Sequence, residues 1–335
     1  MKKFLLIFIF GITATFLVAC NSPKQKYNDF VKSEEIKVVA TTTMLGNLAK
    51  NIGGNKVVVH TMMPAGVDPH TYSPNKLDVD YLLASNIVLV SGLHLEAQAG
   101  QAIKQVNQRG ITVIEATKIL VDKHKNDNED GVKLIDWDDQ EDIEAAKKDG
   151  INELFDPHFW FDVTYWDIVS NYVKDELIKK YPNFREYFEL RYQNYKLELN
   201  ALSNYIDIRL GELKEEQKVL FTAHDAFNYF GQRYNFQVEA VQGVSTEHEA
   251  NTKDIENLVN LAIEKKVHTI FIENSVPRKT IDSIIESAKA NNHKLTIGGE
   301  LFSDSLGNPG QHGDTYIQMI KHNIDTIVDA ILQNN

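Results

Sequence analysis

The sequence predicts an α/β protein of two βα lobes, each a mostly parallel sheet flanked by helices, joined by one long rigid helix. In both halves of the chain, short β-branched runs alternate with stretches of helical pattern, which is typical of parallel sheets covered by helices. Between the halves, Phe184 to about Leu213 contains no proline, and no glycine before Gly211. About thirty residues of helix would span roughly 45 Å, so we interpret this stretch as a rigid strut. An ordinary pair of surface helices is the alternative.

The size and charge of the chain narrow the possible classes of function. A length of 335 residues is enough for two domains with separate cores. The formal net charge of −12 argues against a nucleic-acid partner, because phosphate binding requires a basic face. An acidic protein suits a cationic ligand, although acidity is also common for solubility alone.

The N-terminus carries the pattern of an exported lipoprotein. Lys2 and Lys3 precede an apolar run, Phe4 to Val18, which is too short for a permanent membrane helix. Leu17-Val18-Ala19-Cys20 then resembles a bacterial lipobox, with cleavage before Cys20 and lipid on its sulfur. Cys20 is the only cysteine, so no internal disulfide can form. We therefore expect a protein outside the cytoplasm, lipid-anchored to the bacterial membrane in the periplasm or at the cell surface.

These patterns predict the organisation of the whole chain. We expect a signal peptide over 1–19, a polar lipidated tether over 20–35, an N-terminal lobe over 36–182, a linking helix over 183–213 and a C-terminal lobe over 214–335.

In the N-terminal lobe, β-branched runs predict strands and the stretches between them predict helices. Strands are expected at 36–43, 56–63, 87–92 and 112–115, and helices at 44–51, 75–84, 95–107 and 162–180. Residues 121–153 interrupt this alternation, because they are crowded with Asp, Glu and Lys. We interpret them as a solvated acidic loop with a short helix at 142–148.

The C-terminal lobe repeats the alternation. Strands are expected at 218–222, 237–241, 268–272 and 294–297, and helices at 227–234, 252–265, 280–291 and 316–333.

Four polar side chains, three imidazoles and one carboxylate, form a plausible ligand set for a transition metal. Ligands of parallel sheets bind beyond the carboxyl ends of the strands, and each lobe supplies two of these residues. The candidate metal ligands are His70 after the second strand, His158 before the helix at 162–180, His224 at the end of the first strand of the second half, and Asp304 after the last strand.

Two of these candidates are the last residue of an Asp-Pro-His tripeptide, at Asp68–His70 and Asp156–His158. The proline fixes the local backbone and so presets the direction of the imidazole. Asp68 and Asp156 are expected to orient the imidazoles as hydrogen-bond acceptors, or else to serve in turns and helix caps. Nearby aromatic residues would form an apolar wall or belong to the ordinary core: Tyr72, Phe159, Trp160, Phe161 and Phe227. The other histidines are expected to be solvated, capping or plain strand residues.

The motifs around these residues resemble those of a known family. They are Pro64–His70, Asp156–His158, Ala223–Phe227, Gly298–Asp304 and the closing His322–Val328. The chain resembles, over about 36–332, the zinc/manganese-binding lipoproteins that serve as solute-binding components of metal ABC importers, the TroA-like and pneumococcal surface adhesin-like family. The resemblance implies two βα lobes joined by one long helix, with the metal held between them by His70, His158, His224 and Asp304.

The resemblance limits the choice of metal cargo but does not select one metal. Manganese members often carry Glu at the third ligand position, where this chain has His224, whereas zinc members often carry a long His-rich loop, where residues 121–153 are acidic. The chemistry of a site with three histidines and one aspartate favours Zn²⁺, because affinity rises from manganese to zinc along the divalent series. Mn²⁺ is the alternative cargo, and Fe²⁺ is a further candidate.

The sequence therefore predicts a monomeric solute-binding protein, not an enzyme, that captures a divalent metal and delivers it to an ABC permease and its ATPase. Binding should weaken as the pH falls through the histidine range near 6.5. A metal-dependent hydrolase is one alternative, although it needs an open coordination position and a general base. A surface adhesin is the other, since an acidic lipid-anchored exterior is compatible with cell adhesion.

Overall fold

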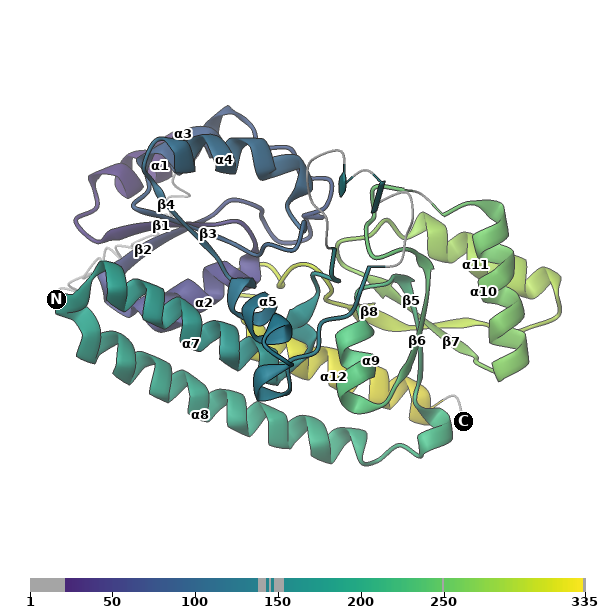
Figure 1. Ribbon diagram of the computed structural model, residues 1–335. Helices are drawn as coiled ribbons and strands as arrows, with labels where there is room; N and C mark the ends of the chain where they lie inside the picture. Colours follow the sequence, from purple (N-terminus) through teal and green to yellow (C-terminus); the bar gives the residue numbers. More distant parts are fainter. Residues whose placement is uncertain (1–21, 138–142, 145, 148–153, 249, 334–335) are drawn as a thin grey trace, which may run out of the picture.

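The computed structural model describes residues 22–137, 143–144, 146–147, 154–248 and 250–333. In Figure 1 two α/β lobes lie side by side; helix α7 lies beneath the N-terminal lobe, and α8 runs beneath both lobes. The segment 1–19, predicted to be a signal peptide, and Cys20 lie outside the described residues. In the described part of the chain, no helix is both long enough and apolar enough to cross a bilayer.

The N-terminal lobe is built on a four-stranded parallel sheet with the order β2-β1-β3-β4. Its strands are β1 (Ile36–Ala40), β2 (Val57–Thr61), β3 (Ile87–Val90) and β4 (Thr112–Glu115), and its helices are α1 (Pro23–Lys32), α2 (Thr43–Gly53), α3 (Lys76–Ala84), α4 (Gly100–Gln108), α5 (Lys118–Lys125) and α7 (Val163–Lys180). Helices α3 and α4 cover one face of the sheet, and α2 and α7 lie on the other (Figure 1).

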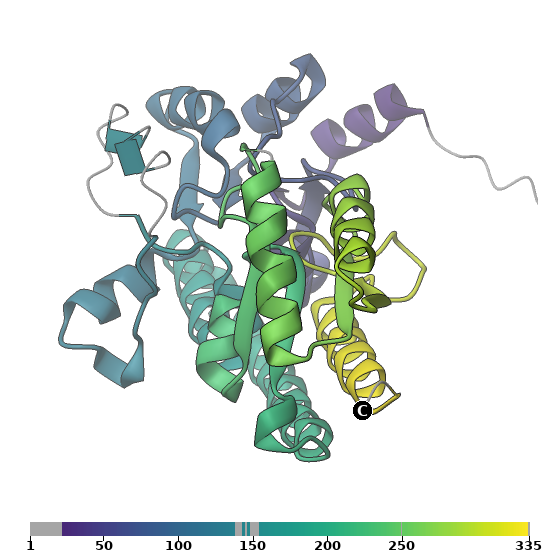
Figure 2. The same ribbon diagram turned by 90° about the vertical axis from the view of Figure 1, so that its right-hand side faces the viewer.

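The C-terminal lobe contains two parallel strand pairs, β5-β6 and β7-β8, with β5 lying beside β7. Its strands are β5 (Val219–His224), β6 (Gln237–Gln242), β7 (Thr269–Glu273) and β8 (Thr296–Leu301), and its helices are α9 (Asn228–Tyr234), α10 (Thr252–Lys265), α11 (Lys279–Ala290) and α12 (Tyr316–Gln333). Figure 2 shows α10 and α11 in front of these strands. The strand predicted at 112–115 has these bounds, and the one predicted at 237–241 ends one residue later. The strand predicted at 294–297 instead spans 296–301, while α7, α8, α10, α11 and α12 lie within a few residues of their predicted ranges.

Short 3-10 helices join several of these elements. They span Gly54–Lys56, Ala97–Ala99, Glu129–Gly131, Phe159–Phe161, Pro182–Phe184 and Glu215–Gln217.

Side-chain caps fix where several helices begin. At α3, the side chain of Asn75 accepts backbone N–H groups while Asp78 accepts the N–H of Asn75. The same reciprocal arrangement joins Asn251 and Asp254 at the start of α10. Such capping boxes satisfy amide groups that the helix itself leaves free. The acids at these positions therefore set helix boundaries in both lobes.

Helix α8 (Arg185–Leu210) has 26 residues and passes from one lobe to the other. The largest hydrophobic cluster is continuous across the molecule: it includes Val38 of the N-terminal sheet, Leu199 of α8 and Phe271 of β7. A shared core resists a wide separation of the lobes, because opening it would expose apolar surface to water. The prediction of two βα lobes joined by one long helix is confirmed.

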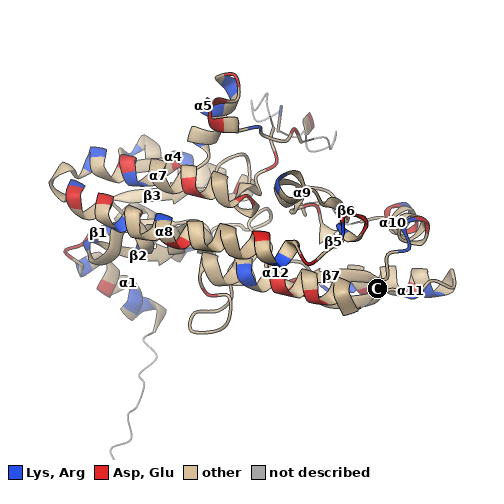
Figure 3. Ribbon diagram, turned by 90° about the horizontal axis from the view of Figure 1, so that it is seen from below, with Lys and Arg blue, Asp and Glu red and all other residues tan. Residues whose placement is uncertain are grey.

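Ionic contacts add to the attachment of α8 to the C-terminal helix α12. Both acidic and basic positions lie along α8 and α12 in Figure 3. Arg209 of α8 bonds Asp325 at 2.8 Å and Asp329 at 2.6 Å, both on α12. Tyr205 donates a further hydrogen bond to Asp325. Exposed ion pairs contribute little singly, so the apolar contacts carry most of this attachment.

Two expectations for irregular segments need correction. The tether predicted over 20–35 contains helix α1 at Pro23–Lys32, which begins at the cap residue Ser22 and buries Phe30 against Tyr81. The acidic segment 121–153 is also partly ordered, since α5 reaches Lys125 and a β-bridge joins Asp136 to Phe155. Of the helix expected at 142–148, residues 143–144 and 146–147 are described and helical, while 142, 145 and 148 lie outside the described residues.

Candidate metal centre

The structure brings the four candidate ligands together between the lobes. His70 lies in the loop after β2, His158 just before the 3-10 helix Phe159–Phe161, His224 at the last position of β5, and Asp304 after β8. One ligand atom from each of these four side chains lies within 4.8 Å of the others. Each residue is at most 1% exposed. We refer to His70, His158, His224 and Asp304 as the His₃Asp cluster.

The imidazole Nε2 atoms and the Asp304 carboxylate face one another. His70 Nε2 lies 3.3 Å from His158 Nε2. One Asp304 oxygen lies 3.3 Å from Nε2 of His158, and the other lies 3.3 Å from Nε2 of His224. Among the described residues, His224 Nε2 and Asp304 Oδ1 find no hydrogen-bond partner although both are buried. Buried polar atoms without hydrogen-bond partners destabilise the folded protein. A divalent cation that binds nitrogen and oxygen ligands would satisfy these atoms.

Each Asp-Pro-His tripeptide builds a bend that aims its histidine at the cluster. Asp68 Oδ1 accepts the backbone N–H of His70 at 2.9 Å, and Asp156 Oδ1 accepts that of His158 at 2.8 Å. Aspartate commonly holds a turn in this way, by bonding the backbone two residues on. Asp156 Oδ1 also lies 2.7 Å from His158 Nδ1. Both proposed roles, turn former and imidazole partner, are therefore combined in Asp156.

Glu273, which the sequence reasoning missed, supports the C-terminal half of the cluster. It is the last residue of β7 and is buried. Its Oε1 accepts the backbone N–H groups of Ala223 and His224 at 2.8 and 2.9 Å. Its Oε2 lies 2.5 Å from His224 Nδ1 as an ion-pair contact. A carboxylate on the far nitrogen of an imidazole fixes the tautomer and orientation that metal binding needs.

The signal for Glu273 was present in the sequence. An acid ends the apolar run Thr269-Ile270-Phe271-Ile272-Glu273 at the same edge of the sheet as His224. Such a residue is a candidate by the strand-end argument that selected His224.

Asparagine side chains hold the chain that carries Asp304. Asn323 of α12 accepts the N–H of Phe302 at 2.9 Å and donates to the carbonyl of Phe302 at 2.7 Å. Asn274 accepts the N–H of Ser303 at 3.2 Å. Ser275 donates to Asp304 Oδ2 at 3.2 Å. Asp304 is thereby fixed from the strand ends on one side and from α12 on the other.

The protonation equilibria of the cluster differ from residue to residue. Burial lowers the pKa of His70 to about 3, assisted by the neighbouring imidazoles. Burial also opposes charge on His158, but the Asp156 and Asp304 carboxylates outweigh it and raise its pKa to about 9. For His224, Glu273 and Asp304 likewise outweigh burial and raise the pKa well above its usual range. His224 and His158 in turn hold the pKa of Asp304 well below its usual range, against the effect of burial.

The pKa of Asp68 is shifted in the opposite direction to that of Asp304. Burial raises its pKa, partly offset by hydrogen bonds from Thr246 and other groups. Its second oxygen accepts hydrogen bonds from Thr71 and Thr246.

The aromatic residues proposed as a wall have mixed roles. Trp160 lies edge-on to His158 with 5.2 Å between ring centroids, and its indole N–H bonds the carbonyl of Ser303. Phe161 and Phe227 stack on each other in the core. Tyr72 instead bonds Asp78 at the start of α3. Only Trp160 of these residues makes a ring contact with the cluster among the described residues.

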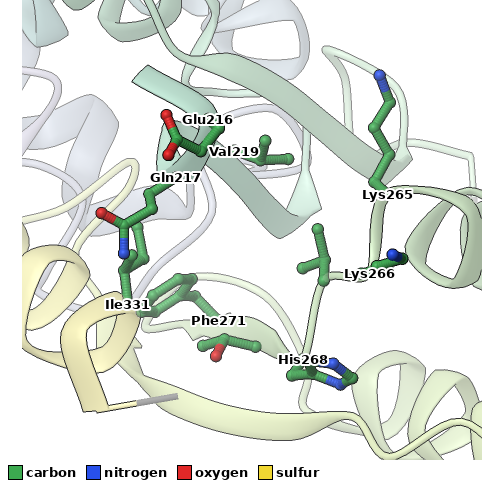
Figure 4. A pocket seen from close by; sticks show the side chains of 10 residues that line it. Glu216, Gln217, Val219, Lys265, Lys266, His268, Phe271 and Ile331 are labelled. Carbon is green, nitrogen blue, oxygen red and sulfur yellow. The ribbon is translucent and has the colours of Figure 1, made fainter. Parts of the chain in front are cut away.

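The histidines excluded on sequence grounds lie outside the cluster. His60 is buried and stacks on Tyr81, and burial lowers its pKa to about 4. His268 and His293 stack on each other at the opposite edge of the C-terminal strands. A small cavity of about 80 Å³ opens at that edge between Glu216, Lys265 and His268 (Figure 4). It is lined by the beginnings of β5 and β7, whereas His224 and Glu273 stand at their ends.

Comparisons with known proteins agree with the fold. The family model described as ZnuA, zinc-uptake complex component A periplasmic, matches residues 38–330. The chain is 35% identical over 298 residues to the manganese-binding lipoprotein MntA of Bacillus subtilis, covering 89% of this chain and 90% of MntA. It is 36% identical over 294 residues to the zinc-binding protein TroA of Treponema pallidum, covering 88% of both.

A solved structure of a relative shows the same architecture. The periplasmic zinc-binding protein TroA from Treponema pallidum superimposes with a TM-score of 0.78 at 35% sequence identity, covering 89% of this chain and 99% of TroA. The family model spans both lobes and all four residues of the His₃Asp cluster. The chain therefore belongs to the ZnuA family of metal-binding solute-binding proteins.

Proposed function

We propose that this protein captures a divalent transition metal outside the cytoplasm and delivers it to an ABC importer. The observation that carries the proposal is the closed His₃Asp cluster, in which three imidazoles and one carboxylate converge out of reach of solvent. His70, His158, His224 and Asp304 are its ligands, and Asp156 and Glu273 orient two of the imidazoles. The permease and its ATPase are the partners, since a relative, PsaA of Streptococcus pneumoniae, is named as the substrate-binding lipoprotein of a manganese ABC transporter.

The ligand set supports Zn²⁺ as the better-held ion and Mn²⁺ as the competitor. Neutral imidazole binds zinc well, and zinc follows manganese in the order of rising affinity. Relatives of similar identity are named for zinc in one case and for manganese in another. Supply outside the cell, together with the importer, then decides which ion is carried.

We also propose that the protein is anchored by lipid and that it is not an enzyme. Cys20 is the lipid-bearing residue, which places the monomer on the outer surface of a membrane. Four protein ligands leave a zinc ion no open position for water, in contrast to hydrolytic sites. The hydrolase and adhesin alternatives are not supported by the relatives, which are named as metal-binding proteins and lipoproteins.

The test is elemental analysis of protein purified without added metal, comparing wild type with the His70→Ala, His158→Ala double variant. The double variant is expected to lose bound metal. The matched control is the His268→Ala, His293→Ala double variant, which removes two imidazoles that stack away from the cluster and should keep its metal. Full occupancy in the His70→Ala, His158→Ala variant would contradict the proposal.

A further inference from the structure

An ion can reach the His₃Asp cluster only if part of the surrounding structure moves. All four side chains of the cluster are at most 1% exposed. The shared core beneath the lobes opposes a wide hinge opening. The route is therefore best sought in a local rearrangement near the cluster.

A cavity of about 350 Å³ lies directly outside the cluster. Its inner lining includes Asp68 and Ser275, and each of these residues is one hydrogen bond from the cluster. Asp68 Oδ1 accepts the backbone N–H of His70 at 2.9 Å, and Ser275 donates to Asp304 Oδ2 at 3.2 Å. No residue of the His₃Asp cluster itself lines the cavity. A wall one residue thick thus separates the two spaces.

The cavity has a mixed lining, in which the apolar residues Ala250, Ile255, Val276 and Pro277 lie beside a group of side chains that carry oxygen atoms. Hydroxyl groups come from Thr71, Thr246, Thr280 and Ser283, while Lys279 is exposed at the rim. Gln242 is buried in the lining, and its Oε1 has no hydrogen-bond partner among the described residues. Oxygen acceptors are suited to the water shell of a hard, hydrated cation. A divalent ion with six waters needs roughly 180 Å³ at about 30 Å³ per water, so the cavity has room for it.

Two residues of the cavity lining, Thr246 and Asp68, are joined by a hydrogen bond between the lobes. Thr246, in the loop after β6, donates to Asp68 Oδ2 at 2.5 Å. Asp68 belongs to the N-terminal lobe and Thr246 to the C-terminal lobe. Separation of this pair would free the Asp68 carboxylate, which stands between the cavity and His70.

We propose that this cavity is an outer holding site for the hydrated divalent cation, and that the Thr246–Asp68 hydrogen bond is the gate between it and the His₃Asp cluster. The inference rests on the proposed metal-binding function. The ion waits in the cavity with its water shell, and exchanges water for imidazole and carboxylate once the gate opens. Release follows the same path in reverse, so the cavity and the gate govern rates and leave the equilibrium affinity unchanged.

The experiment measures association and dissociation rates of Zn²⁺ and Mn²⁺ with the full mature chain by stopped flow. Fluorescence of Trp160, beside His158, reports binding, and a chelator chase reports release. Thr280→Phe and Ser283→Phe fill the cavity, and each should slow both rates by about tenfold. Thr246→Val removes one hydrogen bond from the gate and should speed both rates by about 3- to 10-fold.

Matched controls separate blocking from disturbance of the fold. Glu286→Phe places the same ring on the exposed side of α11, outside the cavity, and should leave both rates unchanged. Ser283 is exposed, so Ser283→Phe tests the route even where Thr280→Phe perturbs the helix.

Two results together would support the proposal. Both rates should fall in the cavity-filling variants and both should rise in Thr246→Val, with Kd constant in each case. Unchanged rates in both cavity-filling variants would overturn it, as would a change in only one of the two rates, which would alter Kd. If wild-type protein bound neither metal, the proposed function itself would fail, which is a distinguishable result.

Discussion

The two Asp-Pro-His loops begin from the same three residues and end in different chemistry. In both, the aspartate accepts the backbone N–H of the histidine two residues on. Asp156 then turns the same oxygen to Nδ1 of His158, whereas Asp68 directs its second oxygen to Thr71 and Thr246. Among the described residues, no carboxylate pairs with Nδ1 of His70 in the way that Asp156 pairs with His158.

This difference teaches that a short motif encodes a bend and not a complete site. The tripeptide determines where the histidine points, because the proline and the aspartate act on the local backbone. What the free carboxylate oxygen does depends on which residues the fold brings beside it. One loop therefore yields a histidine with a raised pKa of about 9, and the other a histidine with a pKa of about 3.

The largest expected effect on metal affinity comes from removing the Asp156 carboxylate, whose contact with an imidazole nitrogen distinguishes its loop from that of Asp68. Asp156→Asn should weaken metal binding about 10- to 100-fold, because partners of metal-bound imidazoles contribute this much to affinity. Asp68→Asn should weaken it by less than about threefold, since Asp68 does not contact an imidazole nitrogen. Competition with a metal-binding dye at fixed pH measures both variants, and equal losses would erase the distinction between the loops.

Glu273→Gln tests whether the carboxylate beside Nδ1 of His224 strengthens metal binding in the same way as Asp156 does beside His158. The glutamine keeps an acceptor for the N–H groups of Ala223 and His224 but loses the charge beside His224 Nδ1. We expect an affinity loss of about tenfold or more, measured by the same competition. Retained affinity together with a normal fold by circular dichroism would show that Glu273 only holds the backbone.

The pKa difference between the loops predicts how many protons leave when metal binds. At pH 7 the imidazoles of His158 and His224 carry protons, because their pKa values are raised, and His70 does not. Since a bound imidazole must be neutral, about two protons should be released per metal ion. Affinity should therefore keep rising with pH up to about 9, above the range near 6.5 expected from an ordinary histidine.

Calorimetry in buffers of different ionisation enthalpy counts these protons. Asp156→Asn removes a group that raises the pKa of His158, so its count should fall towards about one. An unchanged count in this variant would assign the protons to other groups.

The smallest effect concerns the outer contacts of Asp68. Thr71→Val removes the hydroxyl that bonds Asp68 Oδ2 at 2.9 Å, at an exposed position. The free energy of unfolding should fall by less than about 1 kcal/mol, with metal affinity unchanged. Thermal unfolding of the metal-free protein measures the first quantity, and a larger loss would mean that this loop depends on Asp68 more than its geometry indicates.

The sequence was most informative where periodicity and strand ends coincide. Apart from α1 and α5, alternating patterns predicted the helices and strands of both lobes. Strand-end polar residues predicted which side chains would meet between the lobes. Glu273 was missed because a single acid at the end of an apolar strand forms no motif with its neighbours. The use of Asp68 was equally hidden, since its partner Thr246 is far away in the sequence and belongs to the other lobe.

Helix α1 was missed for a different reason. The polar residues of 21–35 obscured two helical signals, the Ser22-Pro23 start and the spacing of Tyr27 and Phe30. Its stability depends on a tertiary contact, Phe30 against Tyr81, and short helices gain most of their stability in this way.

Helix α1 also limits how far the protein can stand from a membrane. With lipid on Cys20, as proposed, only Asn21 separates the anchor from Ser22, the residue that caps the helix. Two residues of extended chain reach at most about 7 Å. This short link would hold the N-terminal lobe close to the lipid headgroups. A permease in the same bilayer could then contact the protein in only a narrow range of orientations.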